Sequence, residues 1–316
     1  MRASVKRLRH GCTLSAALLA LAACETGMLN TSAVPRARPA VAAPVPQITP
    51  TSEESAALRS YLVQVQTAQM GQGLLRDDGG GPDTPFTADT LATNFERIVF
   101  YDEYANALQG RGGESPLRRW SSPIRMEIIS GASVPPSQRE ADNINVRNYA
   151  KRLSDVSGHP ISFFGRPNFV IVIASEDDRS AALDAAAARI PGITASSLDA
   201  LRSLSRDTYC AVAAYAAGSE ASTYTAAVAL IRAENPGLLR LSCIHEELAQ
   251  GMGLANDSRD ARPSIFNDDD EFALLTNHDE LLLKMLYDPR LTPGMRANEA
   301  ASITRIIARE LVSGPL

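Results

Sequence analysis

The side chains best able to do chemistry gather between residues 243 and 257. Glu246 and Gln250 are four residues apart, so they share one face of the helix expected there. The chain can turn at Gly253 and bring Asn256 back to the same face. These three side chains would present oxygen atoms to a ligand, and oxygen suits Ca²⁺, Mg²⁺ or Mn²⁺ better than Zn²⁺. The segment is therefore a candidate site for a divalent cation.

Histidine ligands for zinc are scarce around this segment. His245 and Glu246 begin like the HExxH zinc motif, but Ala249 stands where the second histidine is needed. His159 precedes a proline in a loop and His278 lies at an expected helix start, so we do not expect a three-histidine site. His245 is instead expected to be a helix-surface histidine or one with satisfied hydrogen bonds.

Residues 243–257 resemble the zinc-binding helix and turn of the metzincin peptidases, in particular the matrixins, with the ligands replaced. The resemblance gives the three metal positions to Glu246, Gln250 and Asn256, and the position of the general base to Glu247. Further matching positions are Gly253 at the helix end, Asp257 after the third ligand position, Phe266 in place of the methionine of the Met-turn, Asp279 at the start of a closing helix, and the segment from Trp120 to the strand at Ile124.

The resemblance covers about Trp120–Tyr287 and implies a zincin-like α/β fold: a mixed sheet, a signature helix and a helical C-terminal part. Because the ligands are replaced, we expect a non-catalytic binding or scaffolding module that needs no cofactor. The alternative is an active metallopeptidase or metallohydrolase with unusual oxygen ligands, in which a divalent cation such as zinc or calcium binds and Glu247 is catalytic. The segments EELAQ, SIFNDDD and LYDPRL are also similar to an uncharacterised family of bacterial lipoproteins, defined only as a domain of unknown function.

Two hypotheses without a metal at the signature helix stay open. Glu246, Gln250, Asn256 and Asp257 can hydrogen-bond one another and cap the turn. The acidic run Asn267–Glu271 is a second candidate cation site, or else a solvated loop whose aspartates cap the following helix.

The N-terminus has the pattern of a bacterial lipoprotein leader. Basic residues precede an apolar stretch, Leu14–Ala23, which is too short to span a bilayer and ends before Cys24. Leu21–Cys24 resembles a lipobox, which implies removal of residues 1–23 and lipidation of Cys24. We therefore expect a membrane-anchored, periplasm-facing protein of the cell envelope, in the outer rather than the inner membrane because Glu25 is not Asp.

Cysteine use fits an oxidising compartment. Cys12 is lost with the leader and Cys24 is lipidated, which leaves Cys210 and Cys243. Two remaining thiols in the periplasm are expected to form a disulfide, with a cysteine nucleophile as the less favoured alternative.

Composition and charge place the chain among folded, acidic proteins. It has 316 residues, of which 45% are hydrophobic and 21% charged, and its net charge is -5. Removing residues 1–23 takes away four basic residues and leaves 27 basic against 36 acidic, or -9. Nucleic acid is therefore not an expected partner, whereas an envelope protein or peptide is.

The pattern of the chain predicts a Pro- and Ala-rich tether over residues 24–52 and one domain over residues 53–316. Helices are expected at residues 53–75, 89–107, 143–156, 180–189, 236–252, 278–286 and 298–311, and strands at 123–129, 168–174, 210–217 and 225–233.

Overall fold

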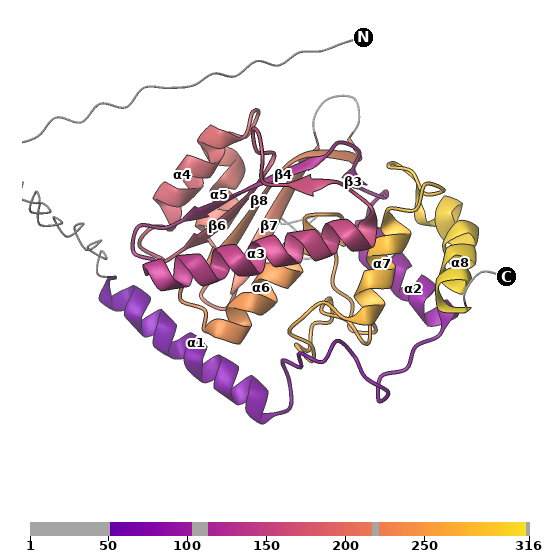
Figure 1. Cartoon of the computed structure of the whole chain (residues 1–316), viewed down its shortest axis with the longest axis horizontal. Coiled ribbons are helices and arrows are strands. Elements are labelled where there is room, and N and C mark those ends of the chain that lie inside the picture. Colours follow the sequence, from indigo (N-terminus) through magenta and orange to yellow (C-terminus); the bar gives the residue numbers. More distant parts are fainter. Residues whose placement is uncertain (1–50, 103–112, 217–220, 314–316) are drawn as a thin grey trace, which may run out of the picture. The chain divides into compact units, whose positions relative to one another are not determined.

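A six-stranded sheet forms the centre of the part that the computed structural model describes, residues 51–102, 113–216 and 221–313 (Figure 1). Its strands are β3 (Arg119–Trp120), β4 (Ile124–Ser130), β5 (Ile161–Ser162), β6 (Phe169–Ala174), β7 (Cys210–Ala216) and β8 (Thr223–Arg232). β5, β4, β6 and β8 lie side by side in this order and run parallel. β7 pairs with β8 in the antiparallel direction, and β3 pairs with the start of β8. β1 (Tyr101–Asp102) and β2 (Gly113–Glu114) form a separate antiparallel pair.

β6 is the central strand because its sequence, FVIVIA, can be buried on both faces. Successive side chains point to opposite sides of a sheet. Phe169 and Ile171 therefore pack into one hydrophobic cluster, and Val170 and Val172 pack into another. The sheet is thus the middle layer of the fold.

Helices cover both faces of this sheet. One face carries α3 (Pro136–Ser157) and α6 (Gly237–Gln250), and the other carries α4 (Arg179–Arg189), the 3-10 helix η1 (Ala195–Leu198) and α5 (Asp199–Arg202). Figure 1 shows α3 passing across the sheet beside α6. α6 leaves directly from the hairpin of β7 and β8, so the candidate residues lie next to an edge strand.

Four further helices complete the described part. α2 (Ala88–Val99), α7 (Asn277–Leu286) and α8 (Ala297–Ser313) pack together and extend the cluster that contains Phe169 (Figure 1). α1 (Glu53–Gly71) contacts the rest mainly through Leu58 and Leu62, which lie against Leu239. Within the described residues, no helix is long and apolar enough to cross a membrane.

The mixed α/β class predicted from the sequence is confirmed, and three helix boundaries differ from the prediction by four residues or more. The first helix ends at Gly71 rather than at residue 75. The second ends at Val99, where Phe100 turns into the core, rather than at residue 107. The third starts at Pro136, because proline fits the first turn of a helix, although its polar first turns hide the helical pattern. Residues 1–50, which include Cys24 and most of the tether, lie outside the described residues.

Candidate functional site

Two glycines let the end of α6 pass through a crowded part of the core. A Cβ atom on Gly251 would lie 2.5 Å from Cζ of Phe169. Gly253 has φ of 123°, and a Cβ atom there would lie 2.3 Å from the carbonyl oxygen of Arg118. No larger residue fits this conformation and space, so the turn that follows the signature helix depends on glycine.

The amide side chains at the replaced ligand positions have partners within the protein. Gln250 donates from Nε2 to Oδ1 of Asp257 over 3.2 Å. Asn256 donates from Nδ2 to the carbonyl oxygens of Arg97, over 2.9 Å, and Asp257, over 2.8 Å. Its backbone N–H also donates to the carbonyl oxygen of Ile98. Gln250 therefore meets Asp257, and Asn256 is fixed against the end of α2.

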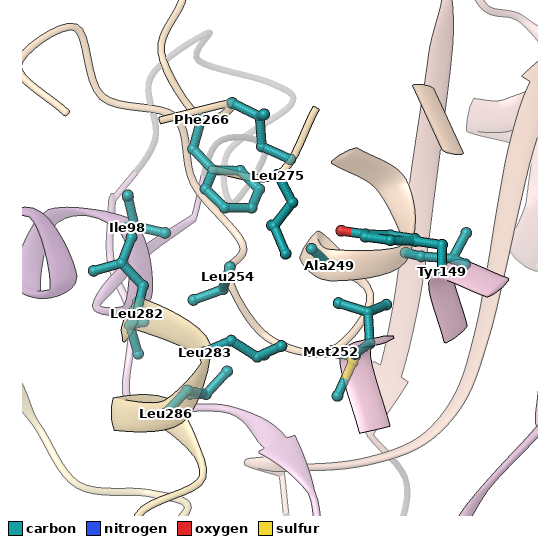
Figure 2. Packing of buried hydrophobic residues seen from close by; sticks show 14 of the residues in the cluster. Ile98, Tyr149, Ala249, Met252, Leu254, Phe266, Leu275, Leu282, Leu283 and Leu286 are labelled. Carbon is teal, nitrogen blue, oxygen red and sulfur yellow. The ribbon is translucent and has the colours of Figure 1, made fainter. Parts of the chain in front are cut away.

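The segment at the position of the Met-turn packs into the same hydrophobic cluster as the end of α6. Phe266 is fully buried, and Figure 2 shows it with Leu254, Leu275 and Ala249 in the hydrophobic cluster. The turn before it is held by Asp279, whose buried carboxylate accepts hydrogen bonds from the hydroxyl of Ser264 and the N–H of Ile265. Phe266 is thus part of the hydrophobic core.

His245 is engaged inside the fold. Its ring stacks on Tyr149, with centroids 3.8 Å apart and an interplanar angle of 9°. Nδ1 accepts a hydrogen bond from the N–H of Leu275, so the proton is on Nε2. Burial lowers the pKa of His245 to about 3, so the imidazole is neutral at physiological pH. His245 is thus one of the satisfied histidines that the sequence analysis described.

The other two histidines of the described part, His278 and His159, have separate partners. His278 is fully buried, and Nε2 lies 3.1 Å from Nδ2 of Asn94. His159 lies with Nε2 2.9 Å from the carbonyl oxygen of Ser122. Burial lowers the pKa of His159.

Cys210 and Cys243 form the predicted disulfide, with Cα atoms 5.8 Å apart, which joins β7 to α6. Single side-chain atoms of Cys210, Glu246 and Glu247 all lie within 4.8 Å of one another. The sulfur of Cys210 is committed to the disulfide, so it is not a thiolate that could bind a metal. Glu247, the candidate base, is only 3% exposed and lies beside this disulfide.

The acidic run Asn267–Glu271 is partly neutralised by arginine. Nε of Arg262 lies 2.5 Å from the carboxylate of Glu271, and this hydrogen bond holds the pKa of Glu271 below its usual value. The expectation that the run caps the following helix is wrong. α7 is capped by Thr276, whose hydroxyl accepts from the N–H of Asp279 while the Asp279 carboxylate accepts from the N–H of Thr276. This buried capping box satisfies the first turn of α7 without the run.

The outer edge of β7 is a feature that the sequence did not reveal. The N–H of Arg232 donates to the carbonyl of Tyr209, and the register that follows directs the backbone groups of Ala211 and Ala213 toward β8. The backbone N–H and C=O of Val212 and Ala214 therefore point outward. In the described part of the chain, no hydrogen bond reaches them. Only the register of the folded hairpin identifies these groups.

A buried charged network at the carboxyl ends of β6 and β8 also escaped the sequence analysis. Arg232 is 2% exposed and pairs with Glu176, which follows β6. Glu234 is fully buried and accepts from the hydroxyl of Ser55 over 2.6 Å and from the N–H of Glu176 over 2.7 Å. The network joins α1 to the end of the sheet. Residues so far apart in sequence carry no spacing signal.

The sequence matches one protein family. A family described as a protein of unknown function (DUF2927) matches residues 88–306, well over half of the sequence. The chain belongs to the DUF2927 family. This match covers the sheet, α6 and the closing turn, and it begins after α1. Neither the curated proteins nor the solved structures contain a match. The comparisons give no evidence for the resemblance to metzincins or to lipoproteins.

Proposed function

We propose that this DUF2927 protein is a cell-envelope lipoprotein whose domain is a degenerate, metzincin-like and non-catalytic binding module. We further propose that it binds an extended peptide segment of an envelope protein along β7. The outward backbone groups of Val212 and Ala214 are the observation that carries the proposal. An exposed row of N–H and C=O groups on an edge strand is a template for adding another strand.

The absence of catalysis is supported by the hydrogen bonds of Gln250 and Asn256. The amide nitrogen of Gln250 donates to Asp257, and that of Asn256 donates to the carbonyl oxygen of Arg97 at the end of α2. These hydrogen bonds fix both side chains within the turn, which is the arrangement that the capping hypothesis predicts.

The layout around α6 supports the metzincin-like part of the proposal. The helix follows an antiparallel edge hairpin and ends at Gln250. The chain after Gly253 then returns to the helix end, where Asp257 accepts a hydrogen bond from Gln250. The buried Phe266 lies in the same hydrophobic cluster as Ala249 of this helix. The resemblance implies a peptide-binding cleft beside such an edge strand, and β7 is that strand here.

The proposal is tested by binding of the full chain to a library of random, labelled decapeptides. Proline has no N–H, so Ala214→Pro should abolish binding while changing the free energy of unfolding little, since that N–H points away from β8. Ala214→Ser keeps the N–H and should bind like the wild type. Failure of every decapeptide to bind, or full binding by Ala214→Pro, would refute the peptide-binding role.

The catalytic alternative is separated by following the same decapeptides by mass spectrometry, with and without a chelator. We expect them to stay intact. Glu247→Gln keeps the shape of the side chain and removes its charge, so binding should be unchanged if Glu247 is not a base. Cleavage that a chelator stops and that Glu247→Gln lacks would establish a metallopeptidase instead.

A further inference from the structure

A single aromatic side chain projects from the turn between β5 and β6. Phe164 is 88% exposed, whereas the next most exposed large hydrophobic side chains among the described residues, Met70 and Ile144, are 52% exposed. The turn is made by Gly165, which has φ of 90°. Burying this ring against a partner would remove its apolar surface from water, which is favourable.

Three arginines lie in this turn or contact the residues next to Phe164: Arg125, Arg147 and Arg166. Nε of Arg125 donates to the carbonyl oxygen of Arg166 over 2.7 Å, and the side chain of Arg125 lies against Gly165. The guanidinium of Arg147 lies 4.3 Å from the ring centre of Phe163, the residue before Phe164. We name the two rings, Phe163 and Phe164, together with Arg125, Arg147 and Arg166 the Phe164 patch.

The three arginines of the Phe164 patch have no carboxylate partner in residues 51–102, 113–216 and 221–313. Some arginines elsewhere face acids, as Arg240 faces Asp142, and others donate to backbone carbonyl oxygens, as Arg119 and Arg139 do. Arg147 and Arg166 are exposed and have neither kind of partner among the described residues. Their positive charge is thus available to an external anion.

We propose that the Phe164 patch is a membrane-contact surface that binds anionic phospholipid headgroups and inserts Phe164 into the bilayer interface. Arginine and phenylalanine together are the combination that holds proteins at this interface, because guanidinium groups bind phosphate and the ring enters the apolar boundary. The surface lies on the β5 side of the sheet, opposite the β7 edge. It therefore acts independently of peptide binding.

A bilayer fits the Phe164 patch better than a protein partner does. Protein partners bury aromatic anchors in a pocket of complementary shape. A bilayer needs no such pocket, because lipids close around a projecting ring. Basic residues near the membrane each contribute about 1 kcal/mol on an anionic surface.

The test places a tryptophan reporter at the tip, Phe164→Trp, in the full chain reconstituted with lipid vesicles. The chain has one other tryptophan, Trp120, which is 1% exposed, so the wild type supplies a constant background. Bromine-labelled phospholipids quench tryptophan within the bilayer. Ile306→Trp, on α8 and 51% exposed, is the matched control for an exposed position elsewhere.

We expect the emission of Phe164→Trp to shift to the blue and to be quenched in vesicles that contain phosphatidylglycerol. It should not change in phosphatidylcholine vesicles, and Ile306→Trp should change in neither. Adding Arg147→Gln and Arg166→Gln to the reporter should lower the ratio of docked to undocked chain about 30-fold, since roughly 1 kcal/mol is lost for each charge.

Two results would overturn the proposal. One is an unchanged reporter in anionic vesicles, or equal quenching in neutral ones. The other is a blue shift that envelope protein extract produces and vesicles do not, because this would make the Phe164 patch a protein-binding surface. Neither result bears on decapeptide binding at β7, so the two proposals can fail separately.

Discussion

At the scale of single residues, the side chains of the signature segment are held by near neighbours. Gln250 is bonded to Asp257, and Asn256 to the end of α2. His245, which first suggests zinc binding, is likewise held by near neighbours. Its Nδ1 accepts from Leu275 and its ring stacks on Tyr149, so protonation would leave a buried charge and turn an acceptor into a donor.

The buried imidazole of His245 makes folding stability depend on pH. Its folded pKa is about 3, while the unfolded chain titrates near 6.5. Since only the unfolded chain takes up a proton between these values, the contribution is complete above pH 6.5 and is lost as the pH falls toward 3. When the pH is lowered from 7 to 5, the unfolding free energy of both proteins is measured. We predict that it falls by about 2 kcal/mol less in His245→Gln than in the wild type.

Urea denaturation at pH 7, 6 and 5 measures this difference. The comparison uses the pH slope of each protein, so a general loss of stability in the variant does not affect it. Parallel curves for the wild type and His245→Gln would show that this histidine titrates alike in the folded and unfolded chains.

At the scale of elements, the sequence predicted well those helices and strands whose position depends on burial alone. The segment 168–174 could only be a central strand, since β-branched side chains fill both of its faces. The end of the signature helix was also predictable, because glycines mark the turn. α3 was predicted seven residues short because packing, not pattern, extends it to Pro136. The direction of backbone groups along β7 requires the register, which no local pattern contains.

The turn after α6 gives a prediction at this scale. Gly253→Ala places a methyl group within 2.3 Å of the carbonyl oxygen of Arg118 and forces alanine to φ of 123°. We expect unfolding free energy to fall by about 3 kcal/mol, since strain of this kind costs roughly 1–3 kcal/mol and the clash adds to it.

Gly237→Ala is the control, because its Cβ atom would meet nothing within 4 Å at the first position of α6. Its unfolding free energy should stay within about 0.5 kcal/mol of the wild type. Chemical denaturation of both variants measures the contrast. Equal stabilities would mean that the turn relaxes and that glycine is not required there.

At the scale of the whole molecule, α1 links the described domain to the segment before it. It precedes the family match and is joined to the rest of the domain by Leu58 and Leu62 and by hydrogen bonds, among them those of Ser55 to Glu234 and of Arg59 to the carbonyl oxygen of Ala233. No sequence signal pairs residues 179 positions apart, so this docking could not be predicted. The proposed tether and lipid lie on the N-terminal side of α1. The membrane would therefore contact the domain through two separate regions, the N-terminus and the Phe164 patch.

These two contacts lead to a prediction for Cys24→Ser, which removes the proposed lipid site. A lipid anchor holds a protein far more firmly than three arginines and one aromatic ring. We therefore expect the wild type to fractionate with membranes and Cys24→Ser to appear in the soluble fraction at physiological salt, even with the Phe164 patch intact. Fractionation with labelled palmitate measures both anchoring and lipidation.

Cys210→Ser is the matched control, because it removes a cysteine without touching the leader and should still take up the label. Membrane association of Cys24→Ser, together with no label on the wild type, would contradict the lipoprotein assignment and leave the Phe164 patch as the stronger of the two contacts.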